Sequence, residues 1–128
     1  YGMFTRGEVP IVLSYFTSPA YHLEYEKTER YQVAKFKDGH YRQIEFAGII
    51  KGTRNSKLAK EFIDFMLSEE FQSVIPLKNW MFPVVQYGPL PESFSIVPKL
   101  NKIQELNPTR VNEQNSKWLR AWSRTMSE

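Results

Sequence analysis

Alternating apolar positions near the start of the chain predict a β-strand over residues 9–15. Pro10 lacks the backbone N–H of a sheet ladder, so the strand should begin late or lie at an edge. Residues 17–19, Thr-Ser-Pro, follow at its carboxyl end, where ligands bind in α/β sheets. Four side chains form one face of this strand, namely Val9, Ile11, Leu13 and Tyr15.

Two further segments are rich in aromatic and β-branched residues. They span residues 31–36 and 41–50, and Lys37-Asp38-Gly39-His40 lies between them. Gly39 accepts a positive φ at little cost, which is typical of a turn. The pattern predicts two strands and allows a hairpin.

Helical spacing of apolar residues begins after Ser56, which we expect to cap a helix. Ser68 is expected to cap a second, shorter helix that runs through Phe71 and Val74 and stops before Pro76. The periodic residues of the first helix are Leu58, Phe62, Phe65 and Met66.

Residues 76–98 are rich in proline, so extended chain and turns are expected there, with Trp80 in an apolar insertion. A last helix is predicted with Asn107 as its cap and Pro108 at its first position. One stripe of that helix should be buried, and Trp118 and Trp122 are assigned to the core. The full stripe is Val111, Asn115, Trp118, Leu119, Trp122 and Met126.

Composition narrows the class of protein. The 128 residues, 41% hydrophobic and 24% charged, suit one folded domain, and no internal boundary is placed. The absence of cysteine excludes disulfides and thiolate metal sites. No apolar run approaches the roughly 20 residues of a membrane span. A net charge of +3 with interspersed signs gives only weak support for nucleic-acid binding, which ranks last.

Known catalytic and metal-binding patterns are missing from the sequence. It contains no nucleotide-binding loop, no zinc spacing and no nucleophile elbow. Its two histidines, His22 and His40, lie far apart without an obvious third ligand and are interpreted as structural or solvated. Neither an enzyme nor a resident cofactor is expected.

The densest candidate for a binding site is the run from Tyr15 to His22. Its tyrosine rings can stack on a flat heterocycle or attract a cation, and its hydroxyls can hold a phosphate or a ring nitrogen. The alternative is that Tyr15 is core and that Thr17 and Ser18 only cap a helix containing Tyr21. For Trp80 the alternative is a ring that fixes the proline-rich loop to the fold. The pattern leaves both alternatives open.

Four segments of the sequence form a specific set of motifs. They are residues 4–8, Phe-Thr-Arg-Gly-Glu; residues 12–22, Val-Leu-Ser-Tyr-Phe-Thr-Ser-Pro-Ala-Tyr-His; Gly39-His40-Tyr41; and Asn79-Trp80-Met81-Phe82-Pro83. Together they resemble one family, the periplasmic thiamine-binding proteins of bacterial ABC importers. The residues Ala59-Lys60-Glu61-Phe62-Ile63-Asp64-Phe65-Met66 are similar to a helix of the wider iron- and polyamine-type binding proteins.

The resemblance implies a fold and a role. The fold is α/β, of the type II periplasmic-binding-protein class, with this chain as only the carboxyl-terminal portion of a two-lobed protein more than twice its length. The role is that of the solute-binding component of an ABC importer. Such a protein binds thiamine, and its phosphates, in the cleft between the lobes and delivers it to a membrane permease from the periplasm. Iron(III) or a polyamine is the alternative ligand.

The resemblance also assigns site residues. Tyr15, Thr17 and Ser18 match the ligand-contacting strand end of the family, and Tyr21 matches a ring that stacks near thiamine. Phe16 departs from a usual threonine, so only its backbone can make that contact. Trp80 matches a tryptophan of the cleft.

Overall fold

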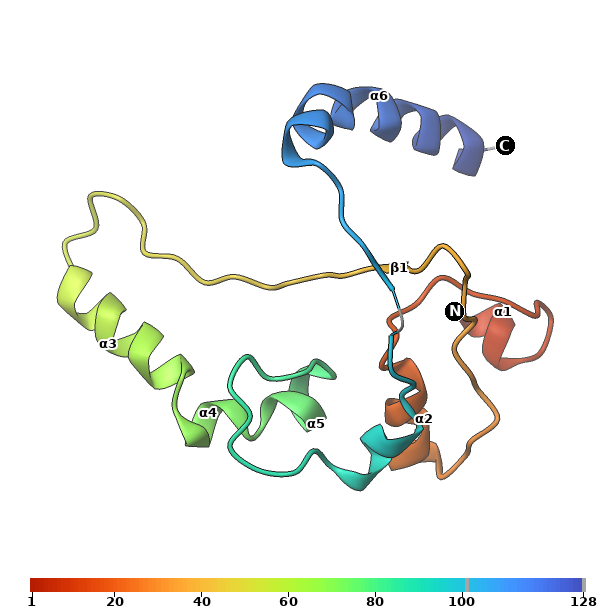
Figure 1. Ribbon diagram of the computed structural model, residues 1–128, viewed down its shortest axis with the longest axis horizontal. Coiled ribbons are helices and arrows are strands. Elements are labelled where there is room, and N and C mark those ends of the chain that lie inside the picture. Colours follow the sequence, from red (N-terminus) through yellow and green to blue (C-terminus); the bar gives the residue numbers. More distant parts are fainter. Residues whose placement is uncertain (101, 128) are drawn as a thin grey trace. The chain divides into compact units, whose positions relative to one another are not determined.

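The computed structural model describes residues 1–100 and 102–127, and helices dominate it (Figure 1). The chain divides into two compact units, one of residues 1–34 and 45–99, the other of residues 35–44 and 100–128. The first unit contains α1 (Gly2–Thr5), α2 (Ser18–Glu26), α3 (Ser56–Met66), α4 (Glu69–Gln72), α5 (Ile75–Asn79) and the 3₁₀ helix η1 (Glu92–Ile96). The second contains β1 (His40–Tyr41), β2 (Ile103–Gln104) and α6 (Pro108–Ser127).

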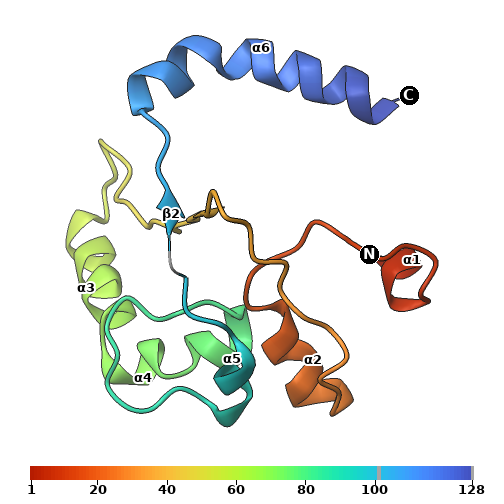
Figure 2. The same ribbon diagram turned by 45° about the vertical axis from the view of Figure 1, so that its right-hand side comes forward.

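The small core of the first unit forms where η1 packs against α2, and both views show the two segments side by side (Figures 1 and 2). Ala20 of α2 is fully buried and Phe94 of η1 is 5% exposed. Two polar residues close to them in the sequence are also buried, Thr17 before Ala20 and Ser93 before Phe94. This contact holds the start of α2 near the end of the proline-rich segment.

The predicted strands are largely wrong. Residues 9–15 and 31–36 are irregular, and no hairpin forms around Gly39. Instead β1 pairs in parallel with β2, which lies more than 60 residues later, in the register His40 to Ile103 and Tyr41 to Gln104. A strand requires a hydrogen-bonded neighbour, and alternation alone does not provide one.

The turn before β1 is confirmed. The N–H of Gly39 donates to the carbonyl of Phe36 at 3.0 Å, and the φ of Gly39 is +93°. A Cβ at this position would lie 2.6 Å from the carbonyl oxygen of Lys102. The turn therefore requires glycine both for its φ and for its close approach to the chain before β2.

The predicted helices α3, α4 and α6 are confirmed, with shifted boundaries. The expectation of only extended chain and turns over residues 76–98 is wrong, because most of α5 and all of η1 lie there. The cap of α3 is Asn55 and not Ser56. Pro76 does not stop a helix, because α4 already ends at Gln72 and Pro76 lies in the first turn of α5, where its missing N–H costs no hydrogen bond. Helix α6 begins as predicted, and the Arg110 N–H donates to Asn107 Oδ1 at 3.2 Å.

The buried stripe predicted for α6 is wrong. No residue of α6 is buried, and Trp118, Leu119, Trp122 and Met126 are 37–67% exposed. Asn115 is exposed and Val111 is half-buried. The periodicity identified the helix correctly, but burial requires a facing surface, which the described part of the second unit does not supply.

Ser68 caps α4 as predicted, and its hydroxyl accepts a hydrogen bond from the Phe71 N–H at 3.4 Å. Glu70 in the first turn has a lowered pKa, chiefly because its own backbone N–H and then the Ser68 hydroxyl donate to the carboxylate. A charged carboxylate is favourable at this end of a helix.

Ser68→Ala should lower the free energy of unfolding by about 1 kcal/mol at pH 7, because it removes this cap. Urea denaturation of the full-length protein measures the change. Ser116→Ala, in the exposed middle of α6, is the control and should cost nothing, since alanine favours a helix. An equal loss in both variants would contradict a specific capping role for Ser68.

Candidate functional site

The predicted site lies at the amino-terminal end of α2. Thr17 occupies the cap position and Pro19 the first turn, both common at helix starts. The Ser18 N–H donates to the carbonyl of Tyr15 at 3.0 Å, which turns the chain sharply into the helix. The structure thus confirms a helix that contains Tyr21, but the predicted strand before it is absent.

The hydroxyls at this end of α2 already have partners within the chain. Ser14 and Ser18 hydroxyls lie 2.7 Å apart, and the Thr17 Oγ1 donates to the backbone carbonyl of Trp80 at 2.6 Å. Thr17 therefore does not cap α2 with its side chain. The hydroxyls predicted to bind a phosphate therefore form hydrogen bonds within the protein. The Tyr21 and Tyr25 rings nearby are exposed to solvent.

Three aromatic rings meet beside α2. The Tyr21 and Trp80 ring centroids lie 5.2 Å apart with planes at 81°, and Tyr25 lies 5.1 Å from Tyr21 and 5.6 Å from Trp80. Edge contacts of this kind suit the charge distribution of aromatic rings. Tyr21 is 41% exposed and Trp80 half-buried. We call these three rings the aromatic cluster.

Phe94 supports the aromatic cluster from the core. Its ring lies nearly parallel to that of Trp80, with a centroid distance of 6.2 Å and a plane angle of 6°. Phe82 makes an edge contact with Phe94 at 5.5 Å. The contacts of Trp80 with Tyr21 and Tyr25 of α2 agree with its interpretation as a ring that fixes the proline-rich segment to the fold, and part of the ring stays exposed.

Trp80 also has an unusual backbone. It follows α5 as the C-cap residue with φ 56° and ψ 35°, in the left-handed region. Left-handed conformation commonly ends helices but costs a residue with a Cβ about 1–2 kcal/mol. The surrounding contacts must offset that cost.

Tyr15 and Phe16 directly precede the cap residue of α2 in the sequence. Tyr15 is 60% exposed, so the interpretation of Tyr15 as core is wrong. Phe16 is half-buried. The assignment of Tyr15 as a ligand contact stays a prediction.

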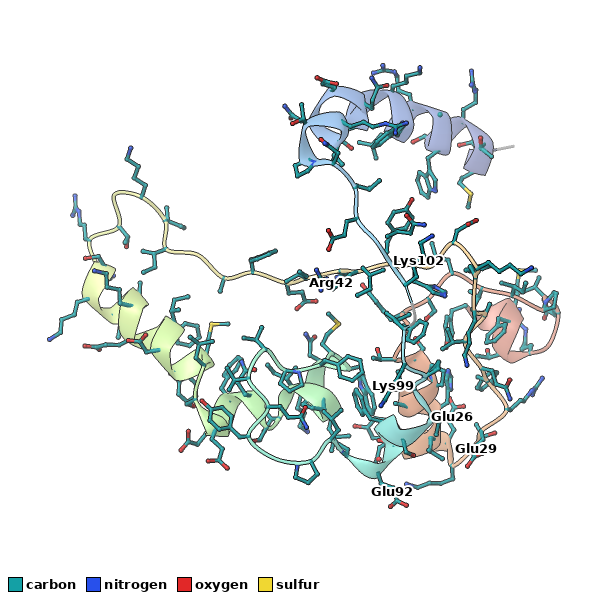
Figure 3. All side chains as sticks on the ribbon, in the orientation of Figure 1. Glu26, Glu29, Arg42, Glu92, Lys99 and Lys102 are labelled. Carbon is teal, nitrogen blue, oxygen red and sulfur yellow. The ribbon has the colours of Figure 1, made fainter. Side chains whose placement is uncertain are left out.

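A second, buried group lies on the same helix as Tyr21. His22 is 2% exposed, its Nε2 lies 2.5 Å from the Tyr1 hydroxyl, and its Nδ1 lies 2.8 Å from Glu26 (labelled on α2 in Figure 3). The Tyr31 ring packs on it at 4.2 Å. Burial raises the pKa of Tyr1. These contacts confirm His22 as structural, and they anchor α2 on the side of the chain's first residues.

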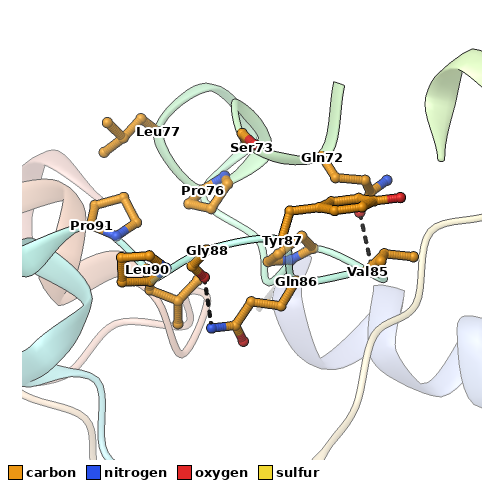
Figure 4. A pocket seen from close by; sticks show the side chains of 12 residues that line it. Gln72, Ser73, Pro76, Leu77, Val85, Gln86, Tyr87, Gly88, Leu90 and Pro91 are labelled. Atoms are coloured by element: carbon orange, nitrogen blue, oxygen red, sulfur yellow. Dashed lines mark hydrogen bonds between the residues drawn. The ribbon is translucent and has the colours of Figure 1, made fainter. Parts of the chain in front are cut away.

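A separate cavity of about 410 Å³ lies between α4, α5 and the proline-rich segment (Figure 4). The Tyr87 hydroxyl donates to the Leu67 carbonyl at 2.7 Å, and the Val85 N–H donates to the Gln72 Oε1 at 3.2 Å. None of the predicted site residues lines this cavity. It is distinct from the aromatic cluster.

Sequence reasoning missed Tyr25 and Phe94. Tyr25 follows Tyr21 by four residues on a helix, and that spacing brings two side chains together, so the pattern held the signal. Phe94 had no comparable signal, because it meets Trp80 only through the packing of η1 on α2.

Within the described ranges, no group of three or more histidine, acidic or cysteine residues is placed to hold a metal ion. In those same ranges, no helix is long and apolar enough to cross a membrane. The exposed rings of Tyr21 and Tyr25 on α2 are suited to contact with a flat or cationic small molecule.

Comparison with known proteins shows the family to which the chain belongs. Residues 1–115 match the family of bacterial extracellular solute-binding proteins, so the chain belongs to that family. Within it, the chain is 42% identical to the thiamine-binding periplasmic protein of Salmonella typhimurium over 127 residues. That match covers 99% of this chain and 38% of the relative. The thiamine-binding periplasmic protein of Brucella suis is 45% identical over 123 residues, covering 95% of this chain and 37% of the relative.

A solved structure agrees with these relatives. The fold matches a periplasmic thiamin binding protein with a TM-score of 0.88 and 41% identity, covering 100% of this chain and 40% of that one. The predicted fold class, part of a type II periplasmic-binding-protein fold, is thereby confirmed. The chain spans about two fifths of the length of these relatives. Their names also agree with the predicted periplasmic location.

Proposed function

We propose that this chain forms part of the thiamine site of a solute-binding protein, and that the aromatic cluster contacts the ligand. The observation that carries the proposal is the nearly perpendicular pair formed by the exposed Tyr21 ring and the half-buried Trp80 ring. The names of the relatives support the choice of ligand.

Thiamine joins a flat pyrimidine to a cationic thiazolium ring, so it offers two faces for stacking and one positive charge. A cation over a tyrosine or tryptophan face gains about 0.5–2 kcal/mol, and ring stacking contributes a similar amount. Two rings at 81° present differently directed faces. The pair thus suits a ligand with two joined rings that are not coplanar.

The remaining predicted contacts have secondary roles in this proposal. Tyr15, exposed before α2, adds a further ring, and Phe16 offers only its backbone. Ser18, whose hydroxyl already meets Ser14, is the side chain we assign to a phosphate ester of thiamine. Because that hydroxyl must change partner, we expect the phosphate to add little affinity from this part of the site.

In this proposal the protein performs no chemistry on its ligand and carries no cofactor. It delivers thiamine to the permease of an ABC importer, and nucleic acid is not a partner. The proposal fits the family, whose members are solute-binding proteins.

Isothermal titration calorimetry of thiamine into the full-length protein tests this function. We expect saturable binding of thiamine and no heat from choline, a cation without rings, or from ferric citrate. Circular dichroism verifies that the sample is folded. Binding of ferric citrate in place of thiamine, or no heat from thiamine with a folded sample, would overturn the proposed ligand.

A further inference from the structure

A single hydrogen bond links the start of α2 to the end of α5. The Thr17 hydroxyl donates to the Trp80 carbonyl oxygen at 2.6 Å, and the two residues are 63 positions apart in the sequence. Thr17 is 5% exposed, so this bond is largely shielded from water. A buried hydrogen bond of this kind is costly to remove, because the carbonyl then loses its partner without gaining water.

The carbonyl that accepts this bond belongs to a strained residue. Trp80 has a φ of 56°, a conformation that residues with a Cβ rarely adopt. Strained conformations persist where the surroundings fix them in more than one way. Here the Thr17 hydroxyl fixes the backbone of Trp80 at the point where α5 ends.

The ring of Trp80 is held separately. Phe94 stacks on it, and Tyr25 contacts it at an angle of 67°. The backbone and the ring of Trp80 are therefore each fixed by contacts with other elements of the same unit. Phe94 and Tyr25 contact the ring of Trp80, whereas the Thr17 hydroxyl contacts its backbone carbonyl.

We infer that Thr17 is a positioning residue, which serves ligand binding by holding Trp80 in its left-handed conformation and not by contacting the ligand. This inference rests on the proposed function, in which Trp80 contacts thiamine. It revises the role that the sequence assigned to Thr17. The Thr17 hydroxyl already donates its hydrogen bond to the Trp80 carbonyl oxygen, and the Thr17 side chain is almost fully buried, so it is poorly placed to contact a ligand directly.

Thr17→Val tests the inference, because valine keeps the shape of threonine and removes the donor. The full-length protein, labelled with 5-fluorotryptophan, is measured by fluorine NMR without ligand, and Trp80→Phe assigns the Trp80 resonance. Thr17→Val should shift or broaden that resonance and raise the Kd for thiamine about tenfold. Thr17→Ser, which keeps the hydroxyl, should restore both.

Two further variants complete the design. Ser14→Ala removes an exposed hydroxyl close in sequence and should leave the Trp80 resonance unchanged. Thr17→Ala replaces Thr17→Val if the valine variant does not fold, and it should have the same effects.

The outcomes separate the inference from the proposed function. A raised Kd with an unchanged Trp80 resonance would make Thr17 a direct ligand contact and would overturn the inference. An unchanged Kd with a changed resonance would overturn it as well. If the resonance changes but the unsubstituted protein binds no thiamine, the hold on Trp80 stands and the proposed function fails.

Discussion

Tyr21→Ala is expected to raise the Kd for thiamine about thirtyfold, which corresponds to ~2 kcal/mol of binding free energy. In the proposed site, the substitution removes a ring that would stack or make a cation–π contact with thiamine, and it also removes the ring that contacts Trp80 at 5.2 Å. Because Tyr21 is 41% exposed, its loss should cost the fold little, and the Tm should change by only a few degrees.

Two variants make this prediction specific. Tyr21→Phe retains the ring and should bind thiamine almost as well as the unsubstituted protein. Tyr87→Ala removes a tyrosine of similar exposure, 49%, that lies at the separate cavity, and should leave the Kd unchanged. Calorimetry gives the Kd, and thermal unfolding gives the Tm. An unchanged Kd for Tyr21→Ala would remove Tyr21 from the site.

Local signals predicted the helices well. The cap and first turn of α6 follow from Asn107 and Pro108, and the cap of α4 follows from Ser68, because these residues act on backbone groups within three or four positions. The one-residue error at the start of α3 is of the same local kind, since Asn55 and Ser56 are both good caps. These three helices could thus be inferred from neighbouring residues alone, whereas α1, α5 and η1 were not predicted.

Strands and burial could not be inferred in that way. The alternation in residues 9–15 is real, but a ladder needs a second strand, and the structure pairs His40–Tyr41 with Ile103–Gln104 instead. The apolar stripe of α6 likewise marks a face suited to burial without supplying the surface that would bury it. Both errors arise because the partner of a segment is set by the whole fold.

In the candidate site, too, contacts within one helix were predictable from the sequence and contacts between distant segments were not. Tyr21 and Tyr25 are neighbours on one helix and were open to prediction from their spacing. The contact of Thr17 with Trp80 joins residues 63 positions apart, and no periodicity could reveal it. The resemblance to thiamine-binding proteins placed both residues in one site, but the structure was needed to show that one of them donates a hydrogen bond to the other.

Phe94→Ala is expected to lower the free energy of unfolding by about 3 kcal/mol, the second large effect. Phe94 is 5% exposed, and truncating a buried phenylalanine loses its transfer free energy and leaves a cavity. The ring also stacks on Trp80, so thiamine binding should weaken together with stability. Urea denaturation at neutral pH measures the first effect and calorimetry the second.

Phe82→Ala provides the matched control for Phe94→Ala. It deletes the same ring from the same group of contacts, but Phe82 is 54% exposed and meets Phe94 only by an edge. Its cost should be less than half that of Phe94→Ala, since burial scales with the apolar area removed from water. Equal costs would mean that η1 does not hold Phe94 in the core beside α2. The support of the Trp80 ring would then have to come from Tyr21 and Tyr25.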